Sequence, residues 1–191
     1  MSRLYVPQPP VRRRPRPVQT DITPARRKVV MLSLALGAFT LGTTEFAAMG
    51  LLPLIAGDLG VTEDQASAAI SAYALGVLVG APGVAALTAR QPRRRLVIVL
   101  LAVIVAGNVL SVVAGSFPVL LGARFVAGIP HGAYFSVAML STASMSPPKE
   151  RGRALAFVVT GLTVATIFGV PAAQAVGDAV GWKAAFGIVA G

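Results

Sequence analysis

The sequence predicts an all-α, polytopic membrane helix bundle with five full transmembrane helices and the start of a sixth. The chain has 191 residues, of which 55% are hydrophobic and only 13% charged, whereas soluble domains carry about 25% charged residues. Apolar runs of at least the roughly 20 residues that cross a bilayer follow one another along the chain. Basic residues are confined almost wholly to the amino-terminal segment and to short stretches between these runs.

Residues 1–28 are predicted to form a disordered, basic, Pro/Arg-rich cytoplasmic tail. They hold six prolines and eight of the 17 lysines and arginines, so little of this segment can bury apolar area. No short apolar core with a small-residue cleavage site follows, as a signal peptide would require. A solvated leader that fixes orientation is the first interpretation, and attraction to anionic lipids is the alternative.

Residues 29–191 are predicted to form the transmembrane bundle. The five full spans are expected at 29–55, 66–87, 96–114, 119–145 and 154–180, and a sixth span begins at residue 182. The segments between them are an acidic loop, the basic stretch RQPRRR, the turn GSFP and the basic stretch SPPKERGR. The sequence stops at Gly191, about 15 Å into the sixth span at a rise of 1.5 Å per residue.

The distribution of charge predicts the orientation. One side of the membrane receives fifteen lysines and arginines, from the tail, from the loop at 90–95 and from the loop at 146–153, and the other receives only Lys183. Because basic loops stay on the cytoplasmic side, the amino terminus is expected to be cytoplasmic. The acidic loop residues Asp58, Glu63 and Asp64 are then expected to face outward.

Several classes of chemistry are excluded by residue content. The chain has no cysteine and one histidine, His131, so thiolate and multi-histidine metal sites are excluded. It has no P-loop, and no acid/base pair or nucleophile arrangement indicates an enzyme, so no cofactor is expected. The net charge of +10 would suit nucleic acid, but the placement of the bases fits membrane topology better, so no nucleic-acid partner is expected.

Small residues recur at four-residue spacing in three spans. The pairs are Gly76 and Gly80, Gly128 and Gly132, and Gly177 and Gly181. This spacing lets helix backbones approach closely, so plain helix packing is the favoured interpretation.

Glu45 is the main candidate for function. It lies in an otherwise uncharged, mostly apolar run at 29–57, where a carboxylate costs about 3 kcal/mol or more. Gly42 and Ala48 share its helix face and leave room for water or a substrate group, and Met49 is flexible. The residue is expected to be a proton or cationic-substrate site. The alternative is a structural carboxylate bonded to a neighbouring helix.

Two further polar candidates lie in the fourth span. Arg124 and His131 fall on one helix stripe with Gly128 and Gly132. Arg124 is expected either to snorkel outward or to pair with Glu45. His131 follows Pro130, which opens a kink, so it is expected either to relay protons or to bond a freed carbonyl.

A bend is expected in the fifth span. Pro171 interrupts it, after Gly161 and Gly169, and such a bend at membrane depth is tolerated when neighbouring helices satisfy the freed groups. It is either a packing kink or a gating, leak-sealing element.

Together these residues resemble the amino-terminal half of the major facilitator superfamily, in particular its bacterial drug:proton antiporters of the chloramphenicol-resistance and arabinose-efflux-permease-like type. The resemblance covers about residues 28–191. It rests on the order of LGTTEF and GLLP, ALTARQPRRR, RFVAGIPHGAYF, ERGRA and GLTVATIFGVPAAQAVGDAVGW.

Three family motifs match only in part. In the loop after the second span, Arg90, Arg93, Arg94 and Arg95 match the basic positions of a cytoplasmic gating motif, but Ala85, Ala89 and Pro92 stand where the family has Gly, Asp and Gly. The fourth-span motif is matched by Arg124 and Gly128. The fifth-span antiporter motif is matched by Gly161, Gly169 and Pro171, with Val170 and Ala173 replacing glycines.

The resemblance implies twelve helices in two halves, with a small-molecule substrate bound between them and alternating access to each side. It implies proton-coupled efflux of a drug, sugar or metabolite across a bacterial inner membrane, with Glu45, Arg124 and His131 at the cavity. The carboxy-terminal half is missing, so the chain is expected to be a fragment or a truncated gene product. The alternatives are an uptake symporter or facilitator of the same fold and a non-transporting membrane fragment.

Overall fold

The computed structural model describes residues 22–88 and 91–190, and all their regular structure is helical. Arg90 and residues 1–21 of the predicted tail lie outside the described residues. The elements in chain order are α1 (Pro24–Gly50), α2 (Leu52–Leu59), α3 (Glu63–Thr88), α4 (Arg93–Val112), α5 (Phe117–Met145), the 3-10 turn η1 (Pro148–Glu150), α6 (Arg151–Val164), the π-helical turn η2 (Ala165–Gly169), α7 (Val170–Val180) and α8 (Trp182–Ala190).

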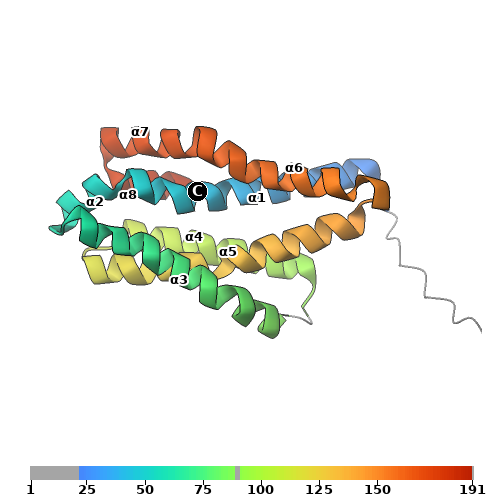
Figure 1. Ribbon diagram of the computed structural model, residues 1–191, viewed down its shortest axis with the longest axis horizontal. Helices are drawn as coiled ribbons and strands as arrows, with labels where there is room; N and C mark the ends of the chain where they lie inside the picture. The colour runs from blue at the N-terminus through green and yellow to red at the C-terminus, as the bar shows by residue number, and fades with distance from the viewer. Residues whose placement is uncertain (1–21, 89–90, 191) are drawn as a thin grey trace, which may run out of the picture.

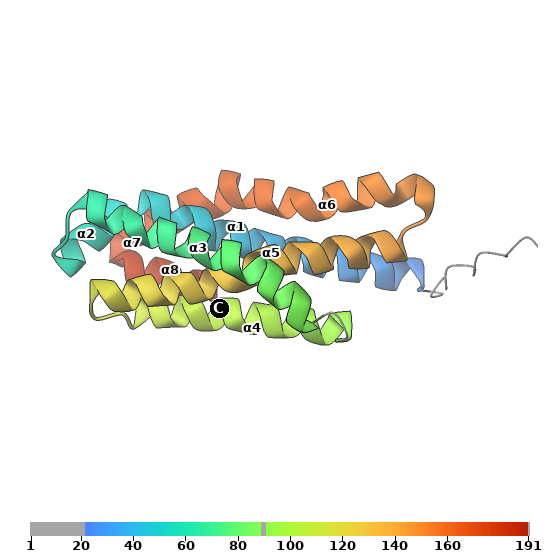
Figure 2. The same cartoon turned by 60° about the horizontal axis from the view of Figure 1, so that its bottom comes forward.

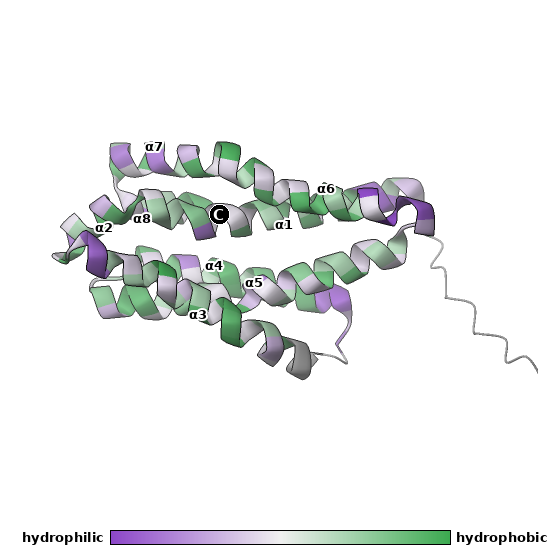
Figure 3. Ribbon diagram, viewed as in Figure 1, coloured by the Kyte–Doolittle hydropathy of each residue, from purple (hydrophilic) through white to green (hydrophobic). Residues whose placement is uncertain are grey.

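The long helices run lengthwise beside one another (Figures 1 and 2). The most extensive packing joins α3 to α5, α4 to α5, and α1 to α6, and α8 packs on α4 and α7. Hydrophilic residues gather toward the two ends of the bundle, and its middle is mostly apolar (Figure 3). This is the pattern of a bundle whose flanks face hydrocarbon and whose ends face water.

The prediction of five full spans is confirmed by length and composition for four of them. Within the part of the chain that the structure describes, four helical stretches are long and apolar enough to cross a membrane: Pro24–Gly50, Glu63–Val84, Arg93–Val112 and Pro148–Val180. The fourth predicted span, α5, is long enough with 29 residues but is not among these four. It carries Arg124 and His131, which lower its mean hydropathy.

The first helix begins earlier than expected. Thr23 caps it, because its hydroxyl oxygen accepts a hydrogen bond from the backbone N–H of Arg26 at 3.4 Å, and Pro24 occupies the first turn. Proline suits this position because no intrahelical partner exists there for its missing N–H. Residues 24–28, expected as disordered tail, are therefore helical.

The first predicted span is broken near its end. Leu51, with φ −96° and ψ 0°, separates α1 from α2, and Pro53 lies in the first turn of α2. The expected acidic loop is also largely helical, since Asp58 belongs to α2 and Glu63 opens α3. Glu63 there is favoured by the helix dipole.

Glycines bring α3 and α5 into close contact. A Cβ atom on Gly76 or Gly80 would collide with the backbone of α5, and one on Gly128 would collide with the carbonyl of Tyr73. The predicted packing role of these glycines is confirmed. Gly181 behaves differently, since it ends α7 with a positive φ of 95° and no neighbour lies within 4 Å of a Cβ placed there.

The fifth predicted span is irregular where the bend was expected. The π-helical turn η2 lies directly before Pro171, between α6 and α7. Proline has no N–H and clashes with the preceding turn, and π-turns are a known cause of kinks. The segment packs on α1, as a Cβ on Gly161 would meet the carbonyl of Ala35.

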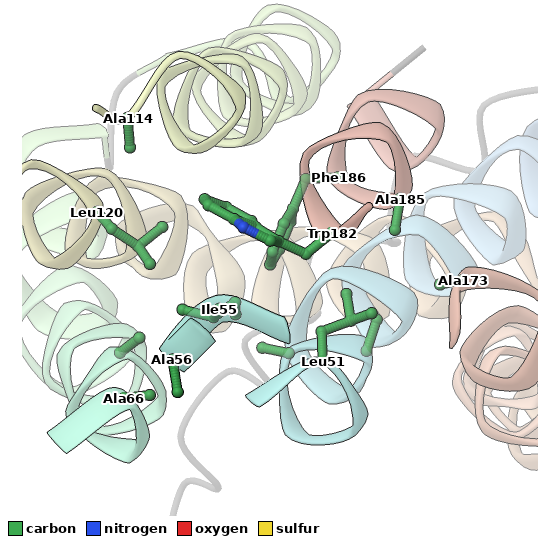
Figure 4. Close-up of a cluster of buried hydrophobic side chains, with 13 residues drawn as sticks. Leu51, Ile55, Ala56, Ala66, Ala114, Leu120, Ala173, Trp182, Ala185 and Phe186 are labelled. Carbon is green, nitrogen blue, oxygen red and sulfur yellow. The ribbon is translucent and has the colours of Figure 1, made fainter. Parts of the chain in front are cut away.

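Two hydrophobic clusters form the core. One joins α1 and α2 to α3, α5, α7 and α8, with Trp182 and Phe186 against Leu51 and Ile55 (Figure 4). The other joins α1 to α4, α5 and α6, and Tyr134 is fully buried in it. The polar residues described next lie between helices that these clusters fix in place.

Candidate functional site

Glu45 faces His131 across the bundle. Its carboxylate Oε2 lies 3.8 Å from Nε2 of His131, so the helix pair α1 and α5 brings the two candidates together. The Glu45 side chain is 30% exposed and that of His131 is 14% exposed. Among the described residues no hydrogen-bond donor reaches the Glu45 carboxylate, so this acid is weakly partnered but remains accessible.

Arg124 does not pair directly with Glu45. None of its nitrogens lies within 4.0 Å of a described carboxylate oxygen. Instead Nη2 donates to the backbone carbonyl of Thr44 at 3.0 Å, next to Glu45 in the chain. Arg124 is 1% exposed, so the alternative in which it snorkels outward is wrong.

Two aromatic rings hold the Arg124 guanidinium. Its central carbon lies 4.6 Å from the centroid of the Tyr73 ring and 5.1 Å from that of Phe186. Cations are attracted to the faces of such rings, more strongly when water is excluded. The three side chains come from α3, α5 and α8, so this contact also ties three helices together.

Arg124 retains unused hydrogen-bonding capacity. Its Nε and Nη1 atoms are buried and have no partner among the described residues. Nearby, Asn108 donates to the Thr44 hydroxyl at 2.9 Å, and its own carbonyl oxygen is likewise buried without a partner. Unsatisfied buried donors carry a desolvation cost of about 1–3 kcal/mol each. An anionic group that approached Arg124 would therefore meet donors already free of water.

Tyr73 belongs to the site and was missed in the sequence. Its hydroxyl lies 3.0 Å from Nδ1 of His131, and the two rings meet edge to face at 5.9 Å and 86°. A signal existed, because Tyr73 shares a helix face with Gly76 and Gly80, three and seven residues on. Apart from this shared face, nothing in the sequence indicates which residue the hydroxyl of a tyrosine in an apolar span would bond.

The histidine is held by side chains rather than by backbone. Its Nδ1 faces Tyr73, its Nε2 faces Glu45, and its ring lies 5.2 Å from that of Phe135. Pro130 does lie inside α5, as expected. The alternative in which His131 bonds a carbonyl freed by this proline is not the arrangement observed.

The basic loop residues lie mostly at the start of α4 rather than in a loop. Arg93 donates to the carbonyl of Leu140 at 3.2 Å and to the hydroxyl of Ser144 at 2.9 Å, both on α5. Arg94 and Arg95 are exposed. Arg93 therefore ties α4 to α5 at this end of the bundle, whereas the role of the motif in gating remains a prediction.

The antiporter-motif glycines Gly161 and Gly169 lie against α1. A Cβ on Gly169 would collide with the hydroxyl oxygen of Thr43, two residues before Glu45. A cavity of about 220 Å³ lies here between α1, α7 and α8. A larger cavity of about 730 Å³ lies at the far end of α1, near Arg27 and Arg153, and does not include Glu45. In the described residues no group of three or more His, Asp or Glu could hold a metal.

The fold and the site define a multi-pass membrane protein with ionisable side chains inside membrane-length helices. The family model of the Major Facilitator Superfamily matches residues 34–191. The chain belongs to this superfamily.

Curated relatives agree with this assignment. The chain is 44% identical over 161 residues to "Inner membrane transport protein YdhP" of Escherichia coli (strain K12), covering 84% of this chain and 41% of the relative. It is 41% identical over 157 residues to "Chloramphenicol resistance protein" of Streptomyces lividans, covering 82% and 40%. It is 37% identical over 163 residues to "Putative transporter AraJ" of Escherichia coli (strain K12), covering 85% and 41%. The chain thus spans about two fifths of the length of these relatives.

Proposed function

We propose that this chain is the amino-terminal half of a proton-coupled exporter of small molecules in a bacterial inner membrane. The observation that carries the proposal is the accessible, weakly partnered Glu45 carboxylate 3.8 Å from the single histidine, inside a membrane-length helix. An ionisable group at this depth is expensive and is usually retained for ion or substrate binding. The names of the relatives that mention inner-membrane transport and chloramphenicol resistance support it.

The proposed mechanism is exchange at Glu45. The carboxylate binds either a proton that enters from outside or a substrate that enters from inside, but not both at once. When the proton has left, rotation of the Glu45 side chain toward Arg124 brings the carboxylate to Nε and Nη1, which have no partner among the described residues. The ionised form is stabilised there, because charge-assisted hydrogen bonds in a dry site are strong. Loading of a new proton or substrate releases this contact.

The remaining parts of the proposal concern the whole transporter. The amino terminus lies in the cytoplasm in this proposal, and the excess of basic residues at one end supports that orientation. A second half, with the substrate cavity between the halves, completes the path, and rocking of the halves gives alternating access. The basic residues from Arg90 to Arg95 act at the cytoplasmic gate. The bend at η2 and Pro171, where Gly169 packs against Thr43 of α1, prevents leakage along α1.

The test uses a full-length parent in proteoliposomes with an imposed proton gradient. Glu45→Gln preserves size and hydrogen-bonding capacity but cannot release a proton, so coupled export is expected to fall at least about tenfold, a loss of about 1.4 kcal/mol in transition-state terms. Proton release upon substrate addition is measured in parallel. Undiminished gradient-driven export by this variant would refute the assignment of Glu45.

The same assay separates the main alternative, an uptake symporter or facilitator of the same fold. An exchanger moves protons and substrate across the membrane in opposite directions, whereas a symporter moves both in the same direction. The matched control is Glu63→Gln, at the exposed start of α3. Export by that variant is expected to equal that of the unaltered protein.

A further inference from the structure

The Tyr73 side chain contacts both His131 and Arg124. Its hydroxyl lies 3.0 Å from Nδ1 of His131, and its ring face lies 4.6 Å from the guanidinium carbon of Arg124. The residue is 2% exposed, and the backbone beneath it is held against Gly128 of α5. Its position is therefore set by packing, and the direction of its hydroxyl is set by the histidine.

We infer that Tyr73 is a positioning residue that fixes His131 as the tautomer with its proton on Nε2, so that Glu45 and not His131 carries the exchanged proton. The inference rests on the proposed function. It assigns the tautomer from both neighbours of the imidazole, since the hydrogen bond at one ring nitrogen decides which nitrogen bears the proton.

Both neighbours favour the same tautomer. Oε2 of Glu45 lies 3.8 Å from Nε2, and an ionised carboxylate only accepts hydrogen bonds, so it favours a proton on that nitrogen. A proton on Nε2 leaves Nδ1 of neutral imidazole as an acceptor, and the Tyr73 hydroxyl at 3.0 Å is placed to donate to it. The opposite tautomer would direct the Nε2 lone pair toward the carboxylate, so that two hydrogen-bond acceptors would face each other.

The consequence concerns where an incoming proton stays. With Nε2 protonated and Nδ1 occupied by the Tyr73 hydroxyl, neither ring nitrogen offers a free lone pair. A proton that arrives at the site therefore forms its O–H bond on Glu45, and His131 remains a neutral donor. Without the Tyr73 hydroxyl, Nδ1 becomes free to take the proton, and the site would hold an imidazolium beside an ionised Glu45.

Three described side chains lie against the His131 imidazole, from α1, α3 and α5. Glu45 from α1 and Tyr73 from α3 are its titratable neighbours, and Phe135 from α5, which does not titrate, packs on the ring. Arg124 makes no hydrogen bond or ring contact with the imidazole among the described residues, but its guanidinium carbon lies over the Tyr73 ring, 4.6 Å from that ring's centroid. Tyr73→Phe removes only the hydroxyl and keeps the ring face that holds Arg124. Changes at His131 in this variant therefore report on the hydrogen bond alone.

The single histidine makes a direct experiment possible. The chain is labelled with ¹⁵N-histidine, so that nuclear magnetic resonance detects one imidazole. At about pH 8, above the ordinary imidazole pKa of about 6.5, the unaltered chain is expected to show protonated Nε2 and an unprotonated, hydrogen-bonded Nδ1. In Tyr73→Phe the Nδ1 signal is expected to move to that of an unbonded nitrogen, and at about pH 6 this variant is expected to contain more imidazolium than the unaltered chain.

Tyr134→Phe is the matched control. Its hydroxyl donates to the carbonyl of Leu34 at 2.8 Å and does not touch His131, so the imidazole signals are expected to stay unchanged. A proton on Nδ1 in the unaltered chain, or identical imidazole signals in Tyr73→Phe, would overturn the inference. This readout needs no transport, so a failure here leaves the Glu45→Gln test intact, and normal export by Glu45→Gln leaves the tautomer assignment intact.

Discussion

Two acidic side chains of this bundle have opposite surroundings. Asp58, at the end of α2, accepts a hydrogen bond from the indole N–H of Trp182 at 3.0 Å and pairs with the Lys183 ammonium at 2.9 Å. Glu45, inside α1, has an imidazole nitrogen 3.8 Å away as its only ion-pair partner among residues 22–88 and 91–190. Asp58, which water could solvate, is well partnered, whereas Glu45, whose charge is costly inside a membrane-length helix, is not. The difference separates a contact that stabilises the fold from a carboxylate that is free to exchange partners.

Arg124 provides the strongest test of this contrast. If the Glu45 site serves function, then Arg124→Met is expected to reduce coupled export at least about tenfold while the free energy of unfolding changes by less than about 1 kcal/mol. The stability change is small because the substitution also removes two unsatisfied buried donors, and replacing buried charges by apolar groups is often neutral. Export by a full-length parent and unfolding in detergent measure the two effects.

Arg93→Met is the matched control for that variant. Arg93 bonds both Leu140 and Ser144 of α5, so its loss is expected to lower the free energy of unfolding by about 1 kcal/mol. A destabilisation of several kcal/mol by Arg124→Met, clearly larger than that of Arg93→Met, would contradict the contrast. Arg124 would then be mainly structural.

Asp58→Asn is expected to show the reverse pattern. The amide keeps the size of the side chain but loses the charge that attracts Trp182 and Lys183. The free energy of unfolding is expected to fall by about 0.5–1 kcal/mol, the range for hydrogen bonds and exposed ion pairs. Export by the full-length parent is expected to stay within about twofold, which is about 0.4 kcal/mol. A large loss of export without loss of stability would place Asp58 in the transport path.

The site residues that could be found from the sequence are those whose charge is costly in an apolar helix. Tyr73, which carries no such cost, was missed. Glu45, Arg124 and His131 stand out because charged and ionisable groups are rare in apolar runs. The structure does bring Glu45 and His131 together, but among the described residues it shows no direct ion pair between Glu45 and Arg124, whose pairing stays a prediction. Helix periodicity fixes which residues share a stripe, whereas the contact across α1 and α5 depends on how the helices pack.

Tyr73 and Trp182 show what packing adds. Both lie in apolar segments, where an aromatic residue ordinarily signals only burial. Tyr73 reaches His131 because glycines hold α3 close to α5, and Trp182 reaches Asp58 because α8 begins beside the end of α2. Helix boundaries were less predictable, since the break at Leu51 depends on Pro53 and the early start of α1 on the cap at Thr23.

The pH response of Asp58 can be observed through the single tryptophan. Hydrogen bonds from Lys183 and Trp182 hold the pKa of Asp58 below its ordinary value of about 3.9. Because the folded-state value is lower than the unfolded one, this stabilisation is fully present above about pH 4 and is lost as the pH falls through the folded-state value. The fluorescence of Trp182, the only tryptophan, is expected to change over that acidic range. In Asp58→Asn it should stay flat there, whereas Glu45→Gln should retain the transition. A transition that persists in Asp58→Asn would assign it to another group.

Lys183→Met is expected to have the smallest effect on stability. It separates the contribution of the Lys183 ammonium to the Asp58 contact from that of the Trp182 indole. The Lys183 and Asp58 side chains are 41% and 46% exposed, and exposed ion pairs contribute at most about 1 kcal/mol and weaken in salt. The loss in free energy of unfolding is expected to be below about 0.5 kcal/mol at low salt and to vanish at about 1 M salt. The Trp182 transition is expected to remain, shifted to higher pH, because one of the two donors that lower the Asp58 pKa has gone. If the variant abolishes the transition, the ammonium and not the indole is the partner that holds Asp58.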